Sequence, residues 1–358
     1  MSDKIQKDIV RMIRPEIHAL KAYSVPPAQG LIKLDAMENP YSWPAEMTEA
    51  WLRVLRTIAL NRYPDPRAVN LKQRLRSAMN IPGDKEMILG NGSDELIQII
   101  LLALARPGQY VLTPTPTFVM YELLAAAAGM GFIDVPLTPD FALDMPAMLA
   151  AIKKHRPAVI FLAYPNNPTG NLFAVEEIEA MLRASDGLVV VDEAYYAFAG
   201  VSFMGRLREF DNLLVMRTMS KQGLAALRLG LLVGTPAWLA EFDKVRLPYN
   251  INSLTQASTE FALSNPVFLE TQAARLRVDR EQLFLALKSI PGVRPWPSRA
   301  NFILFRVRSA AEIFDGLLKQ GILIKNLDHT HALLGGCLRV TIGTPEENQI
   351  FLQALRSI

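Results

Sequence analysis

Short runs of consecutive apolar residues alternate with amphipathic segments through the middle of the chain. The apolar runs predict strands over residues 87–90, 109–113, 158–163, 188–192, 213–217 and 229–234. The segments between them predict helices over residues 93–105, 118–128 and 175–184. A strand without polar alternation is buried on both faces, which is typical of a parallel sheet covered by helices. We therefore expect an α/β fold whose large domain holds a mostly parallel sheet.

The pattern changes on both sides of this region. Residues 1–35 lack a strong apolar periodicity and contain Pro15, Pro26 and Pro27, which predicts an N-terminal arm. A polar link near residues 248–253 precedes a long helical segment and strands expected over 302–307, 322–325 and 338–342. The expected organisation is an arm (1–35), a large cofactor-binding domain (36–248) and a small α+β C-terminal domain (249–358).

Composition and charge narrow the class of protein. Half of the 358 residues are hydrophobic, and 38 basic against 35 acidic residues leave a net charge of +3. This balance gives no reason to expect a nucleic acid or a membrane surface as a partner. Apolar runs are shorter than the roughly 18 residues of a membrane span, and the N-terminus is polar. With a single cysteine, Cys337, excluding an internal disulfide, we expect a cytoplasmic protein.

The histidines at positions 329 and 331 are close enough in sequence to suggest a metal pair. No cluster of acids or cysteines accompanies them. We therefore interpret His329 and His331 as loop histidines and expect no metal site.

Polar residues follow several predicted strands, where an open α/β sheet places its ligands. Residues 90–95 (Gly-Asn-Gly-Ser-Asp-Glu) join a strand to a helix N-terminus that could bind a phosphate. A glycine turn with Ser93 or Asp94 as helix N-cap explains them equally well. Asn167 lies in a stretch that also suits a tight turn. Asp192 ends an apolar strand, and it either caps a helix or pairs with a protonated ring nitrogen such as that of pyridoxal phosphate.

Lys221 follows the strand over 213–217 and lies between apolar segments. A lone lysine is usually a solvated surface residue, but an unpaired ammonium among apolar residues is costly. A lysine kept there commonly has a lowered pKa or forms a Schiff base with an aldehyde, and it can then serve as general acid and base. Ser220 beside it and Arg228, seven positions later, could help to hold a phosphate.

Taken together, the stretches Asn-Pro-Thr-Gly (167–170), Asp-x-x-Tyr (192–195), Ser-Lys (220–221) and Arg228 resemble the fold type I pyridoxal-phosphate aminotransferases. A more specific similarity, to the histidinol-phosphate aminotransferases, rests on six stretches. These are residues 38–40 (Glu-Asn-Pro), 61–66 (Asn-Arg-Tyr-Pro-Asp-Pro), 90–95, 116–121 (Pro-Thr-Phe-Val-Met-Tyr), 164–170 (Tyr-Pro-Asn-Asn-Pro-Thr-Gly) and 338–344 (Leu-Arg-Val-Thr-Ile-Gly-Thr). The resemblance thus covers nearly the whole chain.

The resemblance implies a role for each matching residue in holding pyridoxal 5'-phosphate. Lys221 would bind the cofactor covalently and Asp192 would pair with its pyridine nitrogen. Asn167 and Tyr195 would hydrogen-bond its phenolic oxygen. The cofactor phosphate would be bound by Ser93, Asp94, Ser220 and Arg228.

The resemblance also implies a homodimer with shared active sites, in which Tyr63 reaches the cofactor phosphate of the neighbouring subunit. Arg339 would bind the anionic end of the substrate, with Tyr23 and Asn91 near its tail. The implied reaction moves an amino group between glutamate/2-oxoglutarate and histidinol phosphate/imidazole acetol phosphate in histidine biosynthesis. An aromatic amino-acid aminotransferase would share every cofactor residue, and a threonine-phosphate decarboxylase is a further alternative.

Three features depart from the pattern of the family. Phe118 stands where a tyrosine commonly stacks on the cofactor ring, so stacking is kept and a hydroxyl is lost. Lys325 stands where a second arginine commonly meets the substrate phosphate, which keeps the charge and loses the bidentate fork. The spacing from Lys221 to Arg228 is seven residues, whereas many members have eight.

Overall fold

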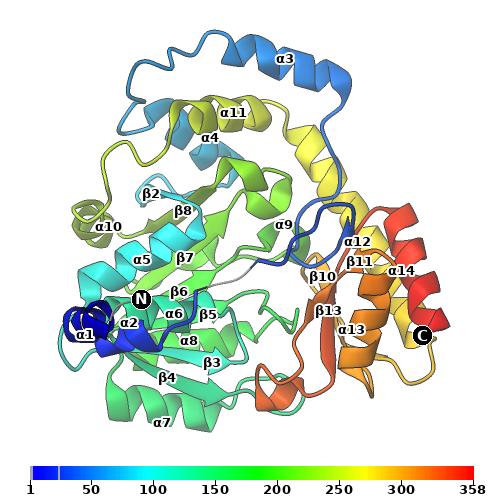
Figure 1. The fold of residues 1–358 in the computed structure, drawn as a ribbon. Helices are drawn as coiled ribbons and strands as arrows, with labels where there is room; N and C mark the ends of the chain where they lie inside the picture. Colours follow the sequence, from blue (N-terminus) through cyan, green and yellow to red (C-terminus); the bar gives the residue numbers. More distant parts are fainter. Residues whose placement is uncertain (1–2, 23–24) are drawn as a thin grey trace.

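The computed structural model describes residues 3–22 and 25–358. A seven-stranded sheet with helices on both faces forms the larger part, and a smaller sheet lies beside it (Figure 1). The seven strands, in order across the sheet, are β2 (Glu86–Asn91), β8 (Leu229–Gly234), β7 (Leu213–Thr218), β6 (Leu188–Asp192), β5 (Val159–Ala163), β3 (Tyr110–Thr115) and β4 (Gly131–Pro136). Strand β8 is antiparallel to its neighbours β2 and β7, and the other pairs are parallel. The expected α/β fold is confirmed.

Strand β4 has no counterpart among the strands predicted from the sequence. It lies at the edge of the sheet, paired with β3, and most of its residues are at least partly exposed. It contains Gly131, Asp134 and Pro136 in place of a continuous apolar run. An edge strand need not be buried on both faces, so it lacks the pattern that marks the central strands.

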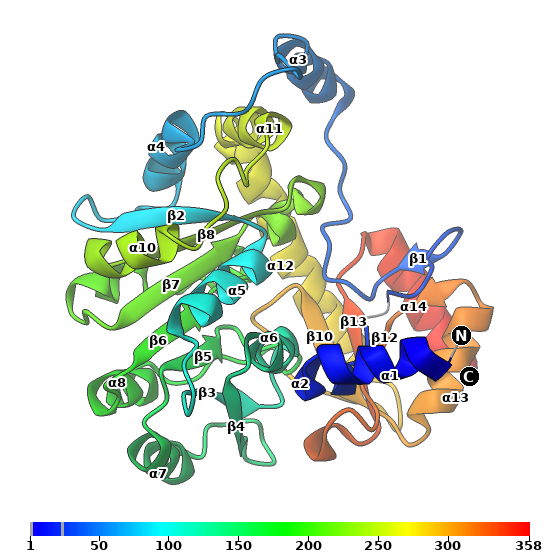
Figure 2. The ribbon, with the colours of Figure 1, turned by 60° about the vertical axis from the view of Figure 1, so that its left-hand side comes forward.

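Helices cover the two faces of the large sheet (Figure 2). Leu96, Tyr121 and Phe242 help to pack one face. They come from α5 (Ser93–Leu104), α6 (Met120–Ala128) and α10 (Pro236–Asp243). Leu75 and Ile152 help to pack the opposite face. The helices there include α4 (Val69–Ala78), α7 (Met145–His155) and α8 (Val175–Ala184).

The small sheet has the order β12 (Lys325–Asn326), β13 (Cys337–Thr341), β10 (Phe302–Arg306) and β9 (Arg294–Pro295), and its pairs are antiparallel. Its helices are α12 (Pro266–Lys288), α13 (Ala310–Lys319) and α14 (Pro345–Ser357). Strand β1 (Ile32–Lys33) pairs with β11 (Ile322–Leu323), so the end of the predicted arm is tied to this part. We keep the division of the chain at residues 35 and 248 as a proposal.

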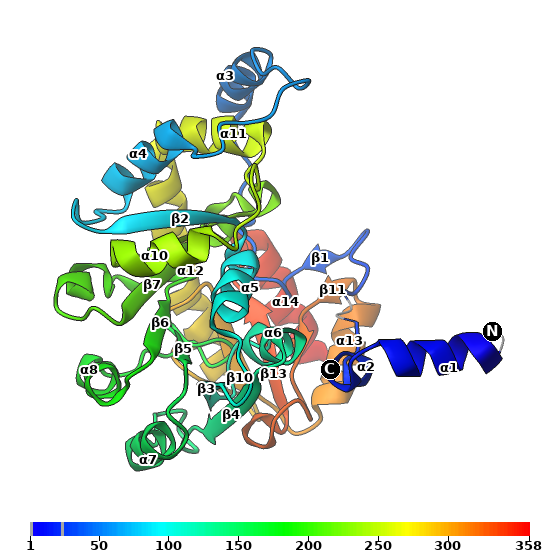
Figure 3. The ribbon, with the colours of Figure 1, turned by 90° about the vertical axis from the view of Figure 1, so that its left-hand side faces the viewer.

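Two segments extend from the body of the molecule. Helix α1 (Asp3–Met12) projects from one side, and α2 (Pro15–Ala19) packs on α6 (Figure 3). Helix α3 (Ala45–Leu55) has no buried residue and rests on α11 (Ser253–Leu263). No helix within residues 3–22 and 25–358 is long and apolar enough to cross a membrane.

Short helical turns complete the structure and shape the ends of the central strands. They are α9 (Tyr196–Ala199), η1 (Met204–Arg208), η2 (Ser220–Gln222), η3 (Ala225–Leu227) and η4 (Ala332–Leu334). Two of them follow a central strand directly in the chain, α9 after β6 and η2 after β7, and polar residues of the site lie there.

Candidate active site

A pocket of about 200 Å³ lies at the carboxyl ends of the parallel strands. Parallel strands end at the same edge of a sheet, so residues far apart in sequence meet there. All the predicted cofactor residues of one subunit line this pocket: Ser93, Asp94, Phe118, Asn167, Asp192, Tyr195, Ser220, Lys221 and Arg228. The structure therefore brings together what the sequence placed on five separate segments.

The N-terminus of α5 forms one end of the pocket. Gly92, with a φ of +91°, precedes the helix, and no side chain caps it. A Cβ on Gly92 would lie 2.5 Å from Nη2 of Arg228, so the close approach of the arginine requires glycine. Arg228 donates to Oγ of Ser220 (3.5 Å), and its Nη2 lies 3.6 Å from Oδ2 of Asp94. Free helix N–H groups, a serine and an arginine suit a phosphate.

The N-cap predicted at Ser93 or Asp94 is wrong, because the helix begins one residue earlier than that interpretation requires. Gly92 occupies the N-cap position and Ser93 is the first helical residue. The carboxylate of Glu95 instead accepts from the backbone N–H of Asn91. The side chains of Ser93 and Asp94 are therefore not used to cap their own helix and line the pocket.

Asp192 also lines the pocket and is almost fully buried. Its Oδ1 accepts from the backbone N–H of Ala194 (3.1 Å) and its Oδ2 from the hydroxyl of Tyr121 (2.7 Å). Burial raises the pKa of Asp192 to about 7, against the effect of these two neutral donors. A cation placed beside this carboxylate would restore its charge, which is what a protonated pyridine nitrogen would do.

Tyr121 contacts the site through Asp192. It stands in the stretch 116–121, but no role was predicted for it from the sequence. It lies on α6, whereas Phe118 precedes that helix, so the helix predicted over 118–128 begins later, at Met120. The backbone N–H of Tyr121 donates to the carbonyl of Phe118 (3.2 Å), and the two rings meet edge to face at 5.6 Å. The sequence pattern did not reveal that Tyr121 reaches Asp192.

Asn167 and Tyr195 meet on one wall of the pocket. Nδ2 of Asn167 donates to the Tyr195 hydroxyl (3.2 Å), and Oδ1 accepts from Nη1 of Arg339. Arg339 also donates through Nη2 to the carbonyl of Asp35 (2.8 Å). Burial raises the pKa of Tyr195, so its phenol stays neutral and able to donate. The predicted cofactor contacts thus adjoin the predicted substrate arginine.

Lys221 points its amine into the pocket. Nζ donates to the carbonyl of Ala36 (3.1 Å) and lies 6.0 Å from the ring centre of Tyr195. Burial, followed by the positive charge of Arg339, lowers the pKa of Lys221 to about 8. At neutral to mildly alkaline pH a substantial fraction of this amine is unprotonated, the form that attacks an aldehyde.

This pKa predicts how fast the cofactor-free enzyme captures pyridoxal phosphate. Only the free amine reacts, so the rate should rise about tenfold per pH unit below pH 8 and level off above it. Stopped-flow absorbance between pH 6 and 11 measures this, with Lys221→Ala as the blank. A rate that keeps rising to the usual lysine pKa of about 10.4 would show an ordinary amine.

A second pocket, of about 320 Å³, adjoins the first and shares Met37, Phe118 and Asn167 with it. Lys325 and Arg339 line it from adjacent positions on β12 and β13, where the two residues pair directly. Burial, then the charge of Arg339, lowers the pKa of Lys325. Two cations beside the cofactor pocket make a place for the anionic end of a substrate.

His331 also lines the second pocket, which the sequence did not indicate. It lies in a loop, as expected, and its Nδ1 accepts from the backbone N–H of Leu333 (3.1 Å). Within the described residues no group of three His, Cys, Asp or Glu side chains could hold a metal ion. Nothing in the local sequence pattern distinguishes His331 from a solvated loop histidine.

Two predicted residues that the structure describes, Tyr63 and Asn91, do not line the pockets of their own subunit. Tyr63 is 80% exposed and stacks on Tyr249 with ring centres 4.5 Å apart. Asn91 is exposed and lines neither pocket. Tyr23 lies outside the described residues. Their roles stay predictions.

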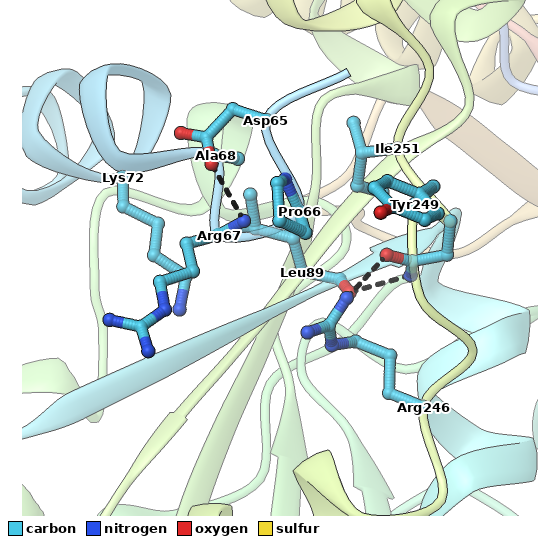
Figure 4. Close-up of a pocket in the computed structure, with 10 residues that line it drawn as sticks. Asp65, Pro66, Arg67, Ala68, Lys72, Leu89, Arg246, Tyr249 and Ile251 are labelled. Carbon is cyan, nitrogen blue, oxygen red and sulfur yellow. Dashed lines mark hydrogen bonds between the residues drawn. The ribbon is translucent and has the colours of Figure 1, made fainter. Parts of the chain in front are cut away.

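The loop that follows Tyr63 packs beside the start of α4 and borders a small cavity of about 10 Å³ (Figure 4). Oδ1 of Asp65 accepts from the backbone N–H of Arg67 there (2.9 Å), and Arg246 donates to Oδ1 of Asn250 (2.9 Å). A cavity of this size holds about one water molecule and no substrate. The loop is held by the bond between Asp65 and Arg67 and by Nε2 of Gln256, which donates to the carbonyl of Asp65 (3.0 Å).

The donor set of the first pocket fits pyridoxal phosphate. Lys221 supplies an amine of lowered pKa, and Asp192 a buried carboxylate whose hydrogen-bond donors are neutral. Phe118 supplies a ring, and the uncapped start of α5 with Arg228 supplies a cradle for a phosphate. Each part of the cofactor thus has a matching group in the pocket.

Comparisons with known proteins agree with this site. Residues 29–355 match the family model "Aminotransferase class I and II". Histidinol-phosphate aminotransferase 2 of Nitrosococcus oceani is 58% identical over 98% of both chains. Histidinol-phosphate aminotransferase 1 of Ralstonia nicotianae is 53% identical over 96% of this chain and 93% of its own. The crystal structure of histidinol-phosphate aminotransferase from Sinorhizobium meliloti in complex with pyridoxal-5'-phosphate superposes with a TM-score of 0.86, at 25% identity and 97% coverage of both chains. The chain belongs to the class I and II aminotransferases, which are pyridoxal-phosphate enzymes.

Proposed function

We propose that the protein transfers the amino group of histidinol phosphate to 2-oxoglutarate, and carries out the reverse reaction, in histidine biosynthesis. The observation that carries this proposal is the pair of cations, Arg339 and Lys325, beside the pocket of Lys221. One cation suffices for a carboxylate, whereas a phosphate monoester of nearly two negative charges favours two. The high identity to relatives named for this activity supports the same substrate.

Bound pyridoxal phosphate supplies an electron sink for the charge that develops at the substrate Cα. Nζ of Lys221 removes the proton from that carbon as general base, a role suited to a pKa of about 8. The charge of Asp192 would hold a proton on the pyridine nitrogen. The hydroxyl of Tyr195 and the amide of Asn167 would orient the ring through its phenolic oxygen.

Arg339 has to accept two kinds of anion in alternate half-reactions. Its guanidinium fork can bind either the carboxylate of glutamate or the phosphate of histidinol phosphate through two hydrogen bonds. Lys325, next to it across β12 and β13, adds a single charge that the phosphate can use. We therefore propose that Lys325 contributes to substrate choice and Arg339 to both half-reactions.

The test of the proposed substrate is a comparison of amino donors with 2-oxoglutarate as acceptor. We expect kcat/KM for histidinol phosphate to exceed that for phenylalanine at least about 100-fold. Phenylalanine has no phosphate, so the charge of Lys325 is left without its partner in the pocket. Lys325→Ala should lower kcat/KM for histidinol phosphate about tenfold and leave phenylalanine almost unaffected. A clear preference for phenylalanine would identify an aromatic amino-acid aminotransferase instead. Release of carbon dioxide from threonine phosphate would identify a decarboxylase.

We further propose a homodimer in the cytoplasm, in which Tyr63 reaches the cofactor phosphate of the partner subunit. The exposure of Tyr63 and of its stacking partner Tyr249, and the lack of any buried residue on α3, support a contact with a second copy. An exposed aromatic pair of this kind is typical of an interface.

Shared sites predict that two defective variants restore each other. When Lys221→Ala and Tyr63→Ala subunits are unfolded together and refolded as a mixture, half of the dimers are hybrids with one intact site. The mixture should then show roughly a quarter of wild-type activity. Lys221→Ala mixed with Asp192→Asn is the control. One subunit supplies both Lys221 and Asp192 to a site, so each site of a hybrid dimer carries one of the two defects. Equal activities of the two mixtures would contradict a shared site.

A further inference from the structure

Behind the cofactor pocket lies a group of contacting residues, two of them buried and two half-buried, that the mechanism above does not use. Its members are Glu193, Tyr196, Arg217 and Gln222, here called the positioning cluster, and none of them lines either pocket. Glu193 directly follows Asp192 at the end of β6, and Gln222 directly follows Lys221 in η2. The cluster therefore connects the neighbours of the two residues that do the chemistry.

The first link is a buried ion pair between the ends of two strands. Nε and Nη2 of Arg217 on β7 lie 2.9 Å from Oε2 of Glu193. Oγ of Ser202 donates to the same carboxylate oxygen (2.8 Å) and accepts from Nη2 of Arg217 (2.7 Å). Glu193 is 0% exposed and Arg217 3% exposed. A fully hydrogen-bonded pair in this setting has one geometry, since a displaced partner would leave a buried charge.

The second link runs from the arginine to the lysine turn. The guanidinium of Arg217 lies 4.1 Å from the ring centre of Tyr196, a cation–π contact. The Tyr196 hydroxyl accepts a hydrogen bond from Nε2 of Gln222 (2.7 Å). The backbone N–H of Tyr196 donates to the carbonyl of Glu193 (3.0 Å), so Glu193, Arg217 and Tyr196 each contact the other two.

The turn that carries Lys221 has little structure of its own. Element η2 is three residues long and is followed by Gly223 at a φ of +90°. Its internal backbone support is the bond from the N–H of Gln222 to the carbonyl of Met219 (3.1 Å). A turn this short depends on outside contacts to hold a side chain in place, and the bond from Gln222 to Tyr196 is such a contact.

We infer that the positioning cluster fixes the turn of Lys221 relative to the strand end of Asp192. It would thereby fix the position of the Lys221 amine relative to the cofactor ring that Asp192 would hold. Its members are positioning residues that act through Lys221 and Asp192 without touching the cofactor. A misplacement of the amine slows proton transfer while leaving the substrate anion site intact. The inference goes beyond the proposed substrate and holds for any amino donor.

Tyr196→Phe tests this inference with the least disturbance, because it keeps the ring under Arg217 and removes only the hydroxyl. We expect the cofactor-free variant to attach pyridoxal phosphate about fivefold more slowly than wild type, the effect of one neutral hydrogen bond. The pH midpoint of the visible absorbance of the bound cofactor should also shift. In turnover, kcat should fall with KM changed less than about twofold, because the substrate anion site is not altered.

Gln222→Leu removes the donor of the same hydrogen bond. The double variant should be no slower than either single variant, since the two changes break one interaction. Tyr110→Phe is the matched control, because Tyr110 lies at the start of β3 with its ring on His155, 5.7 Å away. Wild-type attachment rate and midpoint in Tyr196→Phe would overturn the inference. So would a lowered Tm with an unmoved midpoint, or effects that multiply in the double variant.

Discussion

Lys221→Ala is expected to abolish transamination and the visible absorbance of covalently bound pyridoxal phosphate. The variant loses both the amine that binds the aldehyde and the base that moves the Cα proton, so kcat should fall on the order of 10⁴-fold or more. Its amine is the one that reaches into the pocket, donating to Ala36 beside Tyr195. Initial rates and an absorbance spectrum of the reconstituted protein measure the two effects.

Lys72→Ala is the matched control for this variant. Lys72 is also a half-buried lysine whose pKa is lowered by burial, but it lies on α4 near Glu86, outside both pockets. We expect it to keep wild-type absorbance and turnover. Unchanged activity in Lys221→Ala would refute the role of the lysine.

Asp192→Asn should lower kcat by about 100- to 1,000-fold, the cost of removing one partner of a buried ion pair. An amide cannot hold the positive charge on a pyridine nitrogen, although it can still accept from the hydroxyl of Tyr121. The cofactor-free variant should at the same time melt no lower than wild type at pH 8. The folded pKa of Asp192 is about 7, above its ordinary value of 3.8, so its stabilising contribution is present at low pH and lost as pH rises through 7.

Asp279→Asn provides the comparison, because Asp279 is a buried carboxylate that also accepts from a tyrosine, Tyr41, at 3.2 Å. Its pKa is likewise raised by burial, yet it lies on α12 away from the pocket. We expect kcat of Asp279→Asn to stay within about twofold of wild type. A kcat for Asp192→Asn as high as that of the control would exclude the proposed role of the acid.

The residues that the sequence predicted well are those at the ends of apolar strands. Asp192 and Lys221 follow the buried strands β6 and β7, and parallel strands in one sheet must end at the same edge. Their convergence follows from the topology alone. Strand β4, at the exposed edge, lacks the apolar run and was missed.

The contacts between segments were not predictable in the same way. Lys221 donates to the carbonyl of Ala36, 185 residues away in the chain, and Arg339 to that of Asp35, 304 residues away. Nothing in the residues around Tyr121 indicates that its hydroxyl donates to Asp192. Such pairs depend on how the helices and the small sheet pack, and local patterns carry no information on that packing.

A single-turnover experiment tests the proposed chemistry most directly. The cofactor-loaded enzyme is mixed with excess histidinol phosphate without any 2-oxo acid, and released imidazole acetol phosphate is counted per active site. We predict a release of about one equivalent that then stops and resumes on addition of 2-oxoglutarate, because an aminotransferase must return its amino group before the next cycle. No release, or continued release without 2-oxoglutarate, would contradict the proposal.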